Sequence, residues 1–232
     1  MAYVIPAPQL PALPIADSSD LFPVRRVYCV GRNYAAHARE MGGDPTREPP
    51  FFFMKPADAL QVVPQGRTVD HPYPPKTANY HFEIEMVVAL AKGGRDIPVS
   101  QALDHVFGYA VGLDMTRRDL QDEAKQLRRP WELGKAADHS GPVGPLFPTS
   151  RVGHPTSGTI SLSVDGVQRQ KADLSDMVWS VAEQISYLSA YFELFPGDVI
   201  FSGTPEGVGA VAQGQTMTGA IEGLGQITLR VV

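Results

Sequence analysis

Two acidic residues, Glu83 and Glu85, lie two positions apart in an otherwise apolar segment of the chain. In a β-strand both side chains point to one face, while the side chain of Ile84 points to the other. Two like charges on a buried strand are unfavourable unless a cation neutralises them, and Mg²⁺ and Mn²⁺ prefer carboxylate oxygens. The pair therefore indicates a divalent-metal site. The alternative is a solvated edge strand that carries two exposed acids.

Asp114 is the third candidate ligand for this metal. It ends the apolar segment 108–113, where an isolated acid is otherwise hard to explain. We expect Glu83, Glu85 and Asp114 to converge on one site that keeps positions open for water and a chelating substrate. Even without an ion the three carboxylates should cluster, and their mutual repulsion should raise their pKa values.

His37 and Glu40 form a second candidate pair. Their spacing of three places them on one face of the short helix predicted for residues 34–41. A carboxylate that hydrogen-bonds an imidazole raises its basicity, so the pair can take a proton from water. The alternative is an ordinary pair on a surface helix. Because residues 33–48 offer few apolar side chains, we also expect this segment to be less ordered than the core and to act as a lid.

Lys135 lies in a mostly apolar stretch after Trp131 and Leu133. There its ammonium can stabilise a developing enolate or alkoxide. Arg118 and Gln121 are three positions apart on a predicted helix and can together bind a substrate carboxylate. The alternatives are a surface lysine and a solvated helix face.

The composition limits the classes of protein to which these candidates can belong. Of the 232 residues, 43% are hydrophobic and 19% are charged, which excludes disorder of the whole chain. A net charge of −5 lacks the basic footprint of a nucleic-acid-binding protein, and the single cysteine, Cys29, excludes an intrachain disulfide or a cysteine zinc site. The sequence shows no signal-peptide pattern and no apolar stretch near ~20 residues. We therefore expect a cytoplasmic protein that does not span a membrane.

The elements that must position these side chains are short. The 22 glycines and 21 prolines predict many turns. Only residues 176–194 have the apolar spacing of a long helix, with Ser175 or Asp176 as its N-cap, and Asn33 is expected to cap the helix at 34–41. Asp165-Gly166 predicts the turn of a β-hairpin. Strands are predicted at residues 27–30, 51–54, 82–90, 106–115, 160–164, 199–201 and 226–232, and further helices at 99–106 and 117–127.

These elements predict a β-rich α+β fold, because strands dominate and the helices are few. Residues 64–80 hold several prolines and predict loop with at most an edge strand. We expect residues 1–24, which carry five prolines, to form an N-terminal arm, and residues 25–232 to form a single catalytic domain.

Five segments, taken together and in this order, resemble the fumarylacetoacetate hydrolase family. They are Gly31–His37, Phe53–Pro56, Glu83–Glu85, Gly112–Asp119 and Ser202–Gly209. The resemblance covers about residues 25–232. Within the family, residues 28–41 and 49–53 are most similar to the fumarylpyruvate hydrolase branch, whose members act in gentisate breakdown.

The resemblance implies a mixed β-sandwich roll, a homodimer, and a small keto-acid substrate. It implies Mg²⁺ or Mn²⁺ on Glu83, Glu85 and Asp114, and a water-activating pair of His37 and Glu40 on a mobile lid helix. It also places a set of residues around the substrate, namely Lys135, Arg118, Gln121, Thr204 and Gly203. The chain departs from the family pattern at Phe82, where many relatives have a histidine, and at Ala136-Ala137, and both departures are expected to reshape the pocket.

The resulting hypothesis is metal-dependent hydrolysis of a carbon–carbon bond in an acylpyruvate, with fumarylpyruvate giving fumarate and pyruvate. Glu40, through His37, would take a proton from the attacking water, and Lys135 would stabilise the pyruvate enolate that leaves. Two alternatives stay open. The same site can decarboxylate oxaloacetate or cleave simple acylpyruvates, or the chain is a metal-stabilised binding module without catalytic activity.

Overall fold

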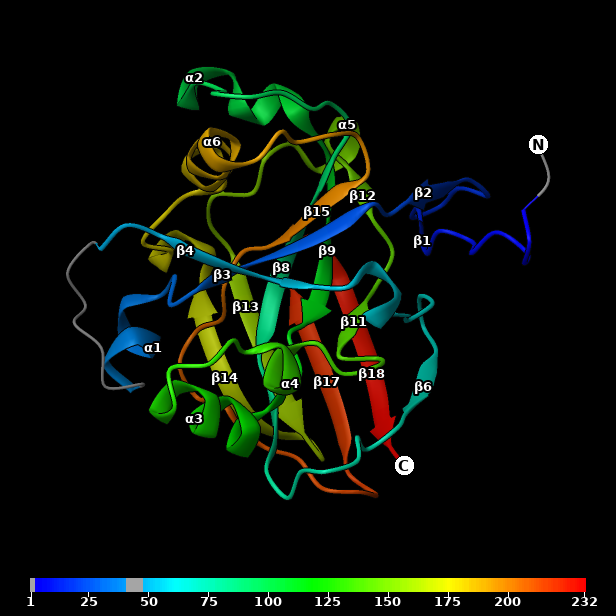
Figure 1. Cartoon of the computed structure of the whole chain (residues 1–232), viewed down its shortest axis with the longest axis vertical. Coiled ribbons are helices and arrows are strands. Elements are labelled where there is room, and N and C mark those ends of the chain that lie inside the picture. The colour runs from blue at the N-terminus through cyan, green and yellow to red at the C-terminus, as the bar shows by residue number, and fades with distance from the viewer. Residues whose placement is uncertain (1–2, 41–47) are drawn as a thin grey trace.

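The computed structural model describes residues 3–40 and 48–232, and β-sheets dominate it (Figure 1). The largest sheet has eight strands. Its order is β4 (Phe51–Lys55), β3 (Arg26–Gly31), β15 (Asp198–Phe201), β8 (Ile84–Leu90), β9 (Val106–Leu113), β11 (Gly141–Val143) and β5 (Leu60–Val62), with β12 (Phe147–Pro148) paired to β9. The β-rich α+β class predicted from the sequence is confirmed.

Three smaller sheets complete the strand structure. A five-stranded sheet has the order β14 (Val167–Asp173), β13 (Thr159–Val164), β17 (Thr216–Ile221), β18 (Gly225–Val231) and β6 (Thr68–His71). The other two join β10 (Thr116–Arg117), β7 (Tyr80–Phe82) and β16 (Gly209–Ala210), and β1 (Ala12–Pro14) with β2 (Leu21–Pro23). As expected, segment 64–80 supplies an edge strand, β6.

The helices are few and short. They are α1 (Ala35–Glu40), α2 (Val99–Ala102), α3 (Arg118–Gln126), α4 (Glu132–Lys135), α5 (Thr149–Val152) and α6 (Val181–Tyr191), with 3₁₀ turns at Ala57–Ala59, Leu103–His105 and Leu174–Asp176. Within the described ranges no helix is long and apolar enough to cross a membrane. The predicted helix at 117–127 is present as α3, whereas α4, β5 and β17 were not predicted.

The larger sheet is buried on both faces, which explains the continuous apolar sequence of β8. Met86 and Val88 pack on one face, against β13, β17, β18 and α6. Val87 and Ala89 pack on the opposite face, in a second core that includes Leu13 of β1. The alternation follows from the two-residue period of a strand. One sheet therefore separates two hydrophobic cores, and only its ends are available for polar side chains.

The hairpin predicted at Asp165-Gly166 is confirmed. Both residues have positive φ, 50° and 78°, as a two-residue turn between right-twisted strands requires. The turn joins β13 to β14, which pair antiparallel from Thr159 opposite Asp173 to Val164 opposite Val167.

The long helix begins later than predicted, at Val181 instead of near Asp176. Ser180 and Glu183 form a reciprocal capping box at its start, in which each side chain accepts a hydrogen bond from the other residue's backbone N–H. A separate capping box between Asp173 and Asp176 closes only a 3₁₀ turn. The predicted start was wrong because two capping signals lie seven residues apart and the second one begins the α-helix.

The predicted role of Asn33 as a helix cap is also wrong. Its side-chain amide donates to the carbonyls of Trp179, at 2.9 Å, and Ser202, at 2.8 Å. Its side-chain oxygen accepts from the Trp179 N–H at 2.7 Å. Asn33 therefore ties the start of α1 to two segments that are distant in the sequence, a pairing that local sequence patterns do not reveal.

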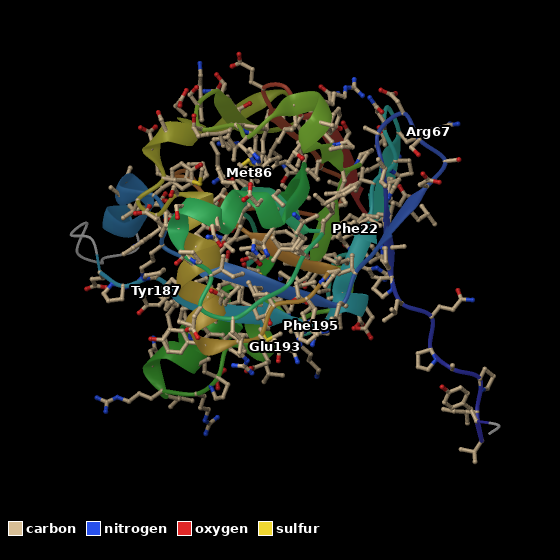
Figure 2. All side chains as sticks on the ribbon, turned by 90° about the horizontal axis from the view of Figure 1, so that it is seen from above. Phe22, Arg67, Met86, Tyr187, Glu193 and Phe195 are labelled. Atoms are coloured by element: carbon tan, nitrogen blue, oxygen red, sulfur yellow. The ribbon has the colours of Figure 1, made fainter. Side chains whose placement is uncertain are left out.

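The N-terminal segment extends away from the rest of the protein before the chain turns into the β1–β2 hairpin (Figure 2). Tyr3, Val4 and Ile5 are exposed, whereas Leu13 and Phe22 are buried in the second core. The hairpin is thus packed against the larger sheet, and the extended part is limited to the residues before it.

Ser180→Ala should lower the free energy of unfolding by about 1 kcal/mol, because the helix loses a capping hydrogen bond. Ser186→Ala, in the middle of the same helix, is the matched control and should change it by less than about 0.5 kcal/mol. Urea denaturation of the two variants measures both values. Equal effects would show that the capping box does not stabilise α6.

Candidate active site

The three predicted metal ligands lie at one end of the larger sheet. Ile84 at the start of β8 pairs with Leu113 at the end of β9, so Glu83 and Asp114 flank this pair. The Asp114 N–H donates to the Glu83 carbonyl at 2.8 Å. The strand predicted at 82–90 is interrupted at Glu83, yet the backbone still brings Glu83, Glu85 and Asp114 together: one ligand atom from each lies within 4.8 Å of the others.

These carboxylates are buried rather than exposed on an edge strand. Glu83 is 5% exposed, and Glu85 and Asp114 are each 1% exposed. The solvated-edge alternative is therefore wrong. Burial of three acids requires compensating charge, because an unpaired ion in a low-dielectric interior is strongly destabilising.

Three buried cations supply that compensation. Lys135 lies 2.8 Å from Glu83 Oε2 and 2.7 Å from Asp114 Oδ2. Arg118 forms an ion pair with Glu83 through Nη2, and Lys55 Nζ lies 2.8 Å from Asp114 Oδ1. The alternatives of a surface lysine for Lys135 and a solvated helix face for Arg118 are therefore wrong.

The electrostatic environment separates the two glutamates. Burial, followed by the charges of Asp114 and Glu83, raises the pKa of Glu85 well above its usual range. Burial also acts to raise the pKa of Glu83, but Lys135 and Arg118 outweigh it and the pKa of Glu83 is lowered. The expectation that repulsion raises the pKa of every ligand is thus wrong for Glu83, because the sequence did not reveal the cations beside it.

The donor set fits Mg²⁺ or Mn²⁺. All three ligands offer hard carboxylate oxygens, and His37, which lines the same cavity, belongs to a separate pair. Among the described residues, Glu85 is the ligand that forms no ion pair with a buried cation; its Oε2 accepts the Gly203 N–H at 2.7 Å. A divalent cation between the three acids would remove the repulsion that raises the pKa of Glu85.

The predicted His37–Glu40 pair is formed on α1. His37 Nδ1 lies 3.2 Å from Glu40 Oε2, and His37 is buried. Both carboxylate oxygens of Glu40 also accept the Gly207 N–H, each at 3.1 Å. The pair is therefore held in place from outside the helix. Of the predicted lid, residues 33–48, the part from 41 to 47 lies outside the described residues.

Besides Lys135, the four residues predicted to surround the substrate are all buried, but their contacts differ. Arg118 hydrogen-bonds Gln121 Oε1 besides pairing with Glu83, so the two side chains form one unit. Thr204 Oγ1 accepts a hydrogen bond from Gln170 at 2.9 Å. The N–H of Gly203 is used by Glu85. Gly203 therefore orients a predicted metal ligand instead of presenting a free donor to the cavity.

A cavity that opens to solvent is lined by most of these groups, although Glu40, Gly203 and Lys55 are not among its lining residues. Helices α1 and α3 lie on the same side of the molecule, and α4 lies between α3 and the sheet strands in the view of Figure 1. The cavity is lined by Val30, Gly31, Arg32, His37, Phe51, Phe53, Glu83, Glu85, Asp114, Arg118, Gln121, Lys125, Trp131, Lys135 and Thr204.

Sequence analysis missed two buried side chains that support this cavity. Lys55 also donates to the Ser140 hydroxyl at 3.0 Å and to the carbonyls of Met115 and Lys135. Gln170 accepts from the Ile84 N–H at 3.0 Å and donates to Thr204. A lysine directly after Phe51–Met54 was a usable signal for Lys55, since a lysine in an apolar strand needs a partner, whereas Gln170 lies in an otherwise exposed strand and gave none.

The two departures from the family pattern do not line the cavity. Phe82 is 1% exposed and packs in the first hydrophobic core. Ala136 and Ala137 face a different surface depression, near Pro72 and His139. Neither departure therefore lines the pocket that it was expected to reshape.

The chain belongs to the fumarylacetoacetate hydrolase family. The sequence model of the family, described as "Fumarylacetoacetate (FAA) hydrolase C-terminal", matches residues 26–232. The structure resembles a crystal structure of fumarylpyruvate hydrolase from Pseudomonas aeruginosa in complex with Mn²⁺ and pyruvate. The TM-score is 0.98 at 61% identity, over 100% of this chain and 99% of that one.

The curated relatives whose names give an activity include two groups. A fumarylpyruvate hydrolase from a Ralstonia species is 43% identical over 188 residues, which cover 81% of this chain and 95% of the relative. A mitochondrial oxaloacetate tautomerase from Arabidopsis thaliana is 41% identical over 206 residues, which cover 89% of this chain and 90% of the relative. The sequence identity to these two curated relatives, 43% and 41%, is thus nearly equal.

The affinity for Mn²⁺ should rise with pH. Burial and the charges of Asp114 and Glu83 raise the pKa of Glu85, so below that raised pKa the carboxyl of the metal-free site holds a proton that binding must displace. Affinity should therefore increase by up to about tenfold per pH unit below that pKa and level off above it. Isothermal titration calorimetry in buffers of different ionisation enthalpy measures both the affinity and the protons released. A pH-independent affinity with no proton release would contradict this assignment.

Proposed function

We propose that the protein hydrolyses a carbon–carbon bond in acylpyruvates, with fumarylpyruvate and water giving fumarate and pyruvate. The observation that carries this proposal is one cavity lined by both a buried three-carboxylate cluster and His37, whose ring lies within hydrogen-bond distance of Glu40. Support comes from a fumarylpyruvate hydrolase with 61% identity and a TM-score of 0.98. A binding module without catalytic activity has no need for a buried imidazole oriented by a carboxylate.

Glu83, Glu85 and Asp114 would hold a Mg²⁺ or Mn²⁺ ion. When bound, such an ion supplies Lewis-acid polarisation of the substrate's keto oxygen and a charge for its carboxylate. The buried cations Lys55, Lys135 and Arg118 already balance the three acids. A divalent ion therefore leaves the pocket with a net positive charge, which suits a substrate with two carboxylates.

His37 acts as the general base in this mechanism. Glu40 accepts the hydrogen bond from Nδ1–H, which leaves Nε2 free to take a proton from water. The Gly207 N–H fixes Glu40 and so limits the rotation of the pair. The water then attacks the keto carbon distal to the pyruvate carboxylate, and the bond between that carbon and the methylene breaks, with its electron pair passing to the pyruvate enolate. The proton that His37 took from water then goes to the methylene carbon, which gives pyruvate, and the new carboxylic acid loses its proton to solvent.

Lys135 stabilises the leaving group, the enolate of pyruvate. Burial opposes its charge, but Asp114 and Glu83 outweigh burial and raise its pKa. The ammonium is therefore cationic across the physiological pH range and can interact with the oxygen on which negative charge develops. Arg118, Gln121 and Thr204 would orient the pyruvyl end, and Gly203 would act indirectly through Glu85.

A second candidate reaction is the tautomerisation of oxaloacetate. Several curated relatives carry that name, including a human mitochondrial protein with 40% identity over 207 residues. The same His37–Glu40 pair could move a proton between carbon and oxygen without any attacking water. Decarboxylation of oxaloacetate, the alternative favoured by the sequence alone, would also pass through a pyruvate enolate.

The proposed setting is gentisate-type aromatic breakdown in the cytoplasm, by a homodimer. The single catalytic unit would span residues 25–232. The acidic cluster, the pair on α1 and the segment Ser202–Gly209 all fall within that range.

His37→Ala should lower kcat on fumarylpyruvate by about 10²–10⁴-fold, because the attacking water loses its base. The affinity for Mn²⁺ should stay within about twofold, since His37 is not a proposed ligand. Glu83→Ala is the matched comparison: it should weaken Mn²⁺ binding and lose activity through that defect. Steady-state kinetics and calorimetry on both variants separate the two roles. Full hydrolytic activity of His37→Ala would refute the mechanism.

A substrate panel should separate the candidate reactions. With Mn²⁺ present, we expect kcat/KM for pyruvate release from fumarylpyruvate to exceed that for oxaloacetate by at least about 100-fold. Only the hydrolysis of fumarylpyruvate is accelerated by the water that His37 activates, whereas decarboxylation uses no attacking water. A coupled lactate dehydrogenase assay measures both. Loss of the oxaloacetate enol without pyruvate release, and no cleavage of fumarylpyruvate, would establish the tautomerase reaction instead.

A further inference from the structure

The outer part of the cavity contains two cations that the mechanism does not use, Arg32 and Lys125. Both line the same cavity as the carboxylate cluster. The other lining cations, Arg118 and Lys135, are paired with Glu83. In the described part of the chain Arg32 forms no ion pair, so its charge is available to a ligand.

An aromatic wall lines the same cavity as these cations and the carboxylate cluster. Trp131 contacts Phe51 edge-on at 5.6 Å between ring centroids, and it contacts Phe53 at 5.8 Å. Phe51 is seated directly on Gly31, where an added Cβ would lie 2.1 Å from the ring. The wall is thus formed by close packing and offers flat apolar surfaces to a ligand.

Each aromatic ring of the wall forms a cation–π contact with one basic side chain. Lys135 Nζ lies 5.0 Å from the Phe53 centroid, at the end of the wall nearest the carboxylate cluster. Lys125 Nζ lies 5.6 Å from the Trp131 centroid, and the Arg32 guanidinium lies 5.8 Å from the Phe51 centroid. These cation–π contacts hold the basic groups in place beside the apolar surface.

Lys125 and Arg32 are positioned for the cavity in different ways. Lys125 has a side chain that is 28% exposed and donates to Asp122 at 3.2 Å, which leaves further N–H donors on its ammonium. Arg32 has a positive φ of 55°, which turns its side chain away from the direction a regular strand would give it after β3. Burial lowers the pKa of Lys125, and the charges of Arg118 and Arg32 contribute to the same direction.

We propose that Arg32 and Lys125 form a subsite for a distal carboxylate, which makes the enzyme selective for acylpyruvates whose acyl group ends in a second carboxylate. The inference rests on the proposed hydrolase function and specifies its substrate class. A flat, conjugated acyl chain lies against the wall of Phe51, Phe53 and Trp131. The pyruvyl end is then held near the carboxylate cluster, and the far carboxylate pairs with the two outer cations.

The test compares fumarylpyruvate with its crotonyl analogue, in which a methyl group replaces the distal carboxylate. Arg32→Met and Lys125→Met should each lower kcat/KM for fumarylpyruvate by about 10- to 100-fold, the usual effect of losing a hydrogen bond to a charged group. Activity on the crotonyl analogue should stay within about twofold, which also shows that the variants fold. Arg32→Lys should restore part of the loss.

Arg129→Met is the matched control for net charge, because Arg129 is exposed and outside the cavity lining. It should leave both substrates unchanged. The proposal is overturned if the double variant Arg32→Met/Lys125→Met keeps the wild-type preference for fumarylpyruvate, or if the variants lose both substrates equally. If the wild-type protein cleaves neither substrate in the presence of Mn²⁺, the proposed hydrolase function itself fails.

Discussion

The structure depends on one electrostatic constraint, the burial of three carboxylates at one end of a sheet that is apolar on both faces. Glu83, Glu85 and Asp114 are tolerated there because Lys55, Lys135 and Arg118 are buried against them. The cations come from β4, α4 and α3, so these elements must dock on the end of β8 and β9. Loss of any one cation would leave the buried carboxylates outnumbering the buried cations, and an uncompensated buried charge is far more costly than loss of a surface ion pair.

The fold was predictable wherever one local signal decided the outcome. The apolar run of β8, the turn at Asp165-Gly166 and the amphipathic spacing of α6 each agreed with the structure. Predictions failed where two local signals competed or where a distant partner decided. The start of α6 was misplaced because Asp173–Asp176 also has capping chemistry, and Asn33 looked like a helix cap because its partners, Trp179 and Ser202, are more than 140 residues away in the sequence.

The candidate site likewise contains features that local spacing predicts and features that depend on distant partners. Spacing alone indicated the acids and the His37–Glu40 pair, because strand and helix periods place those side chains on common faces. Spacing could not show which cation lies beside which acid, so the pKa of Glu83 was expected to rise although Lys135 and Arg118 lower it. Nor could it show that the N–H of Gly203 is already bonded to Glu85. Side-chain pairing across distant elements is set by tertiary packing.

The segment Ser202–Gly209 links the two clusters. Its Gly203 N–H holds Glu85 of the acidic cluster, and its Gly207 N–H holds Glu40 of the pair on α1. The carbonyl of Ser202 accepts from Asn33, just before α1, and a Cβ on Gly203 would lie 2.5 Å from the Asn33 Cβ. Glycine is therefore required at 203 both for its φ of 100° and for this close approach. Because one segment fixes both carboxylates, the distance between the metal ligands and the water-activating pair is set by backbone hydrogen bonds, and a shift of this segment would displace both clusters together.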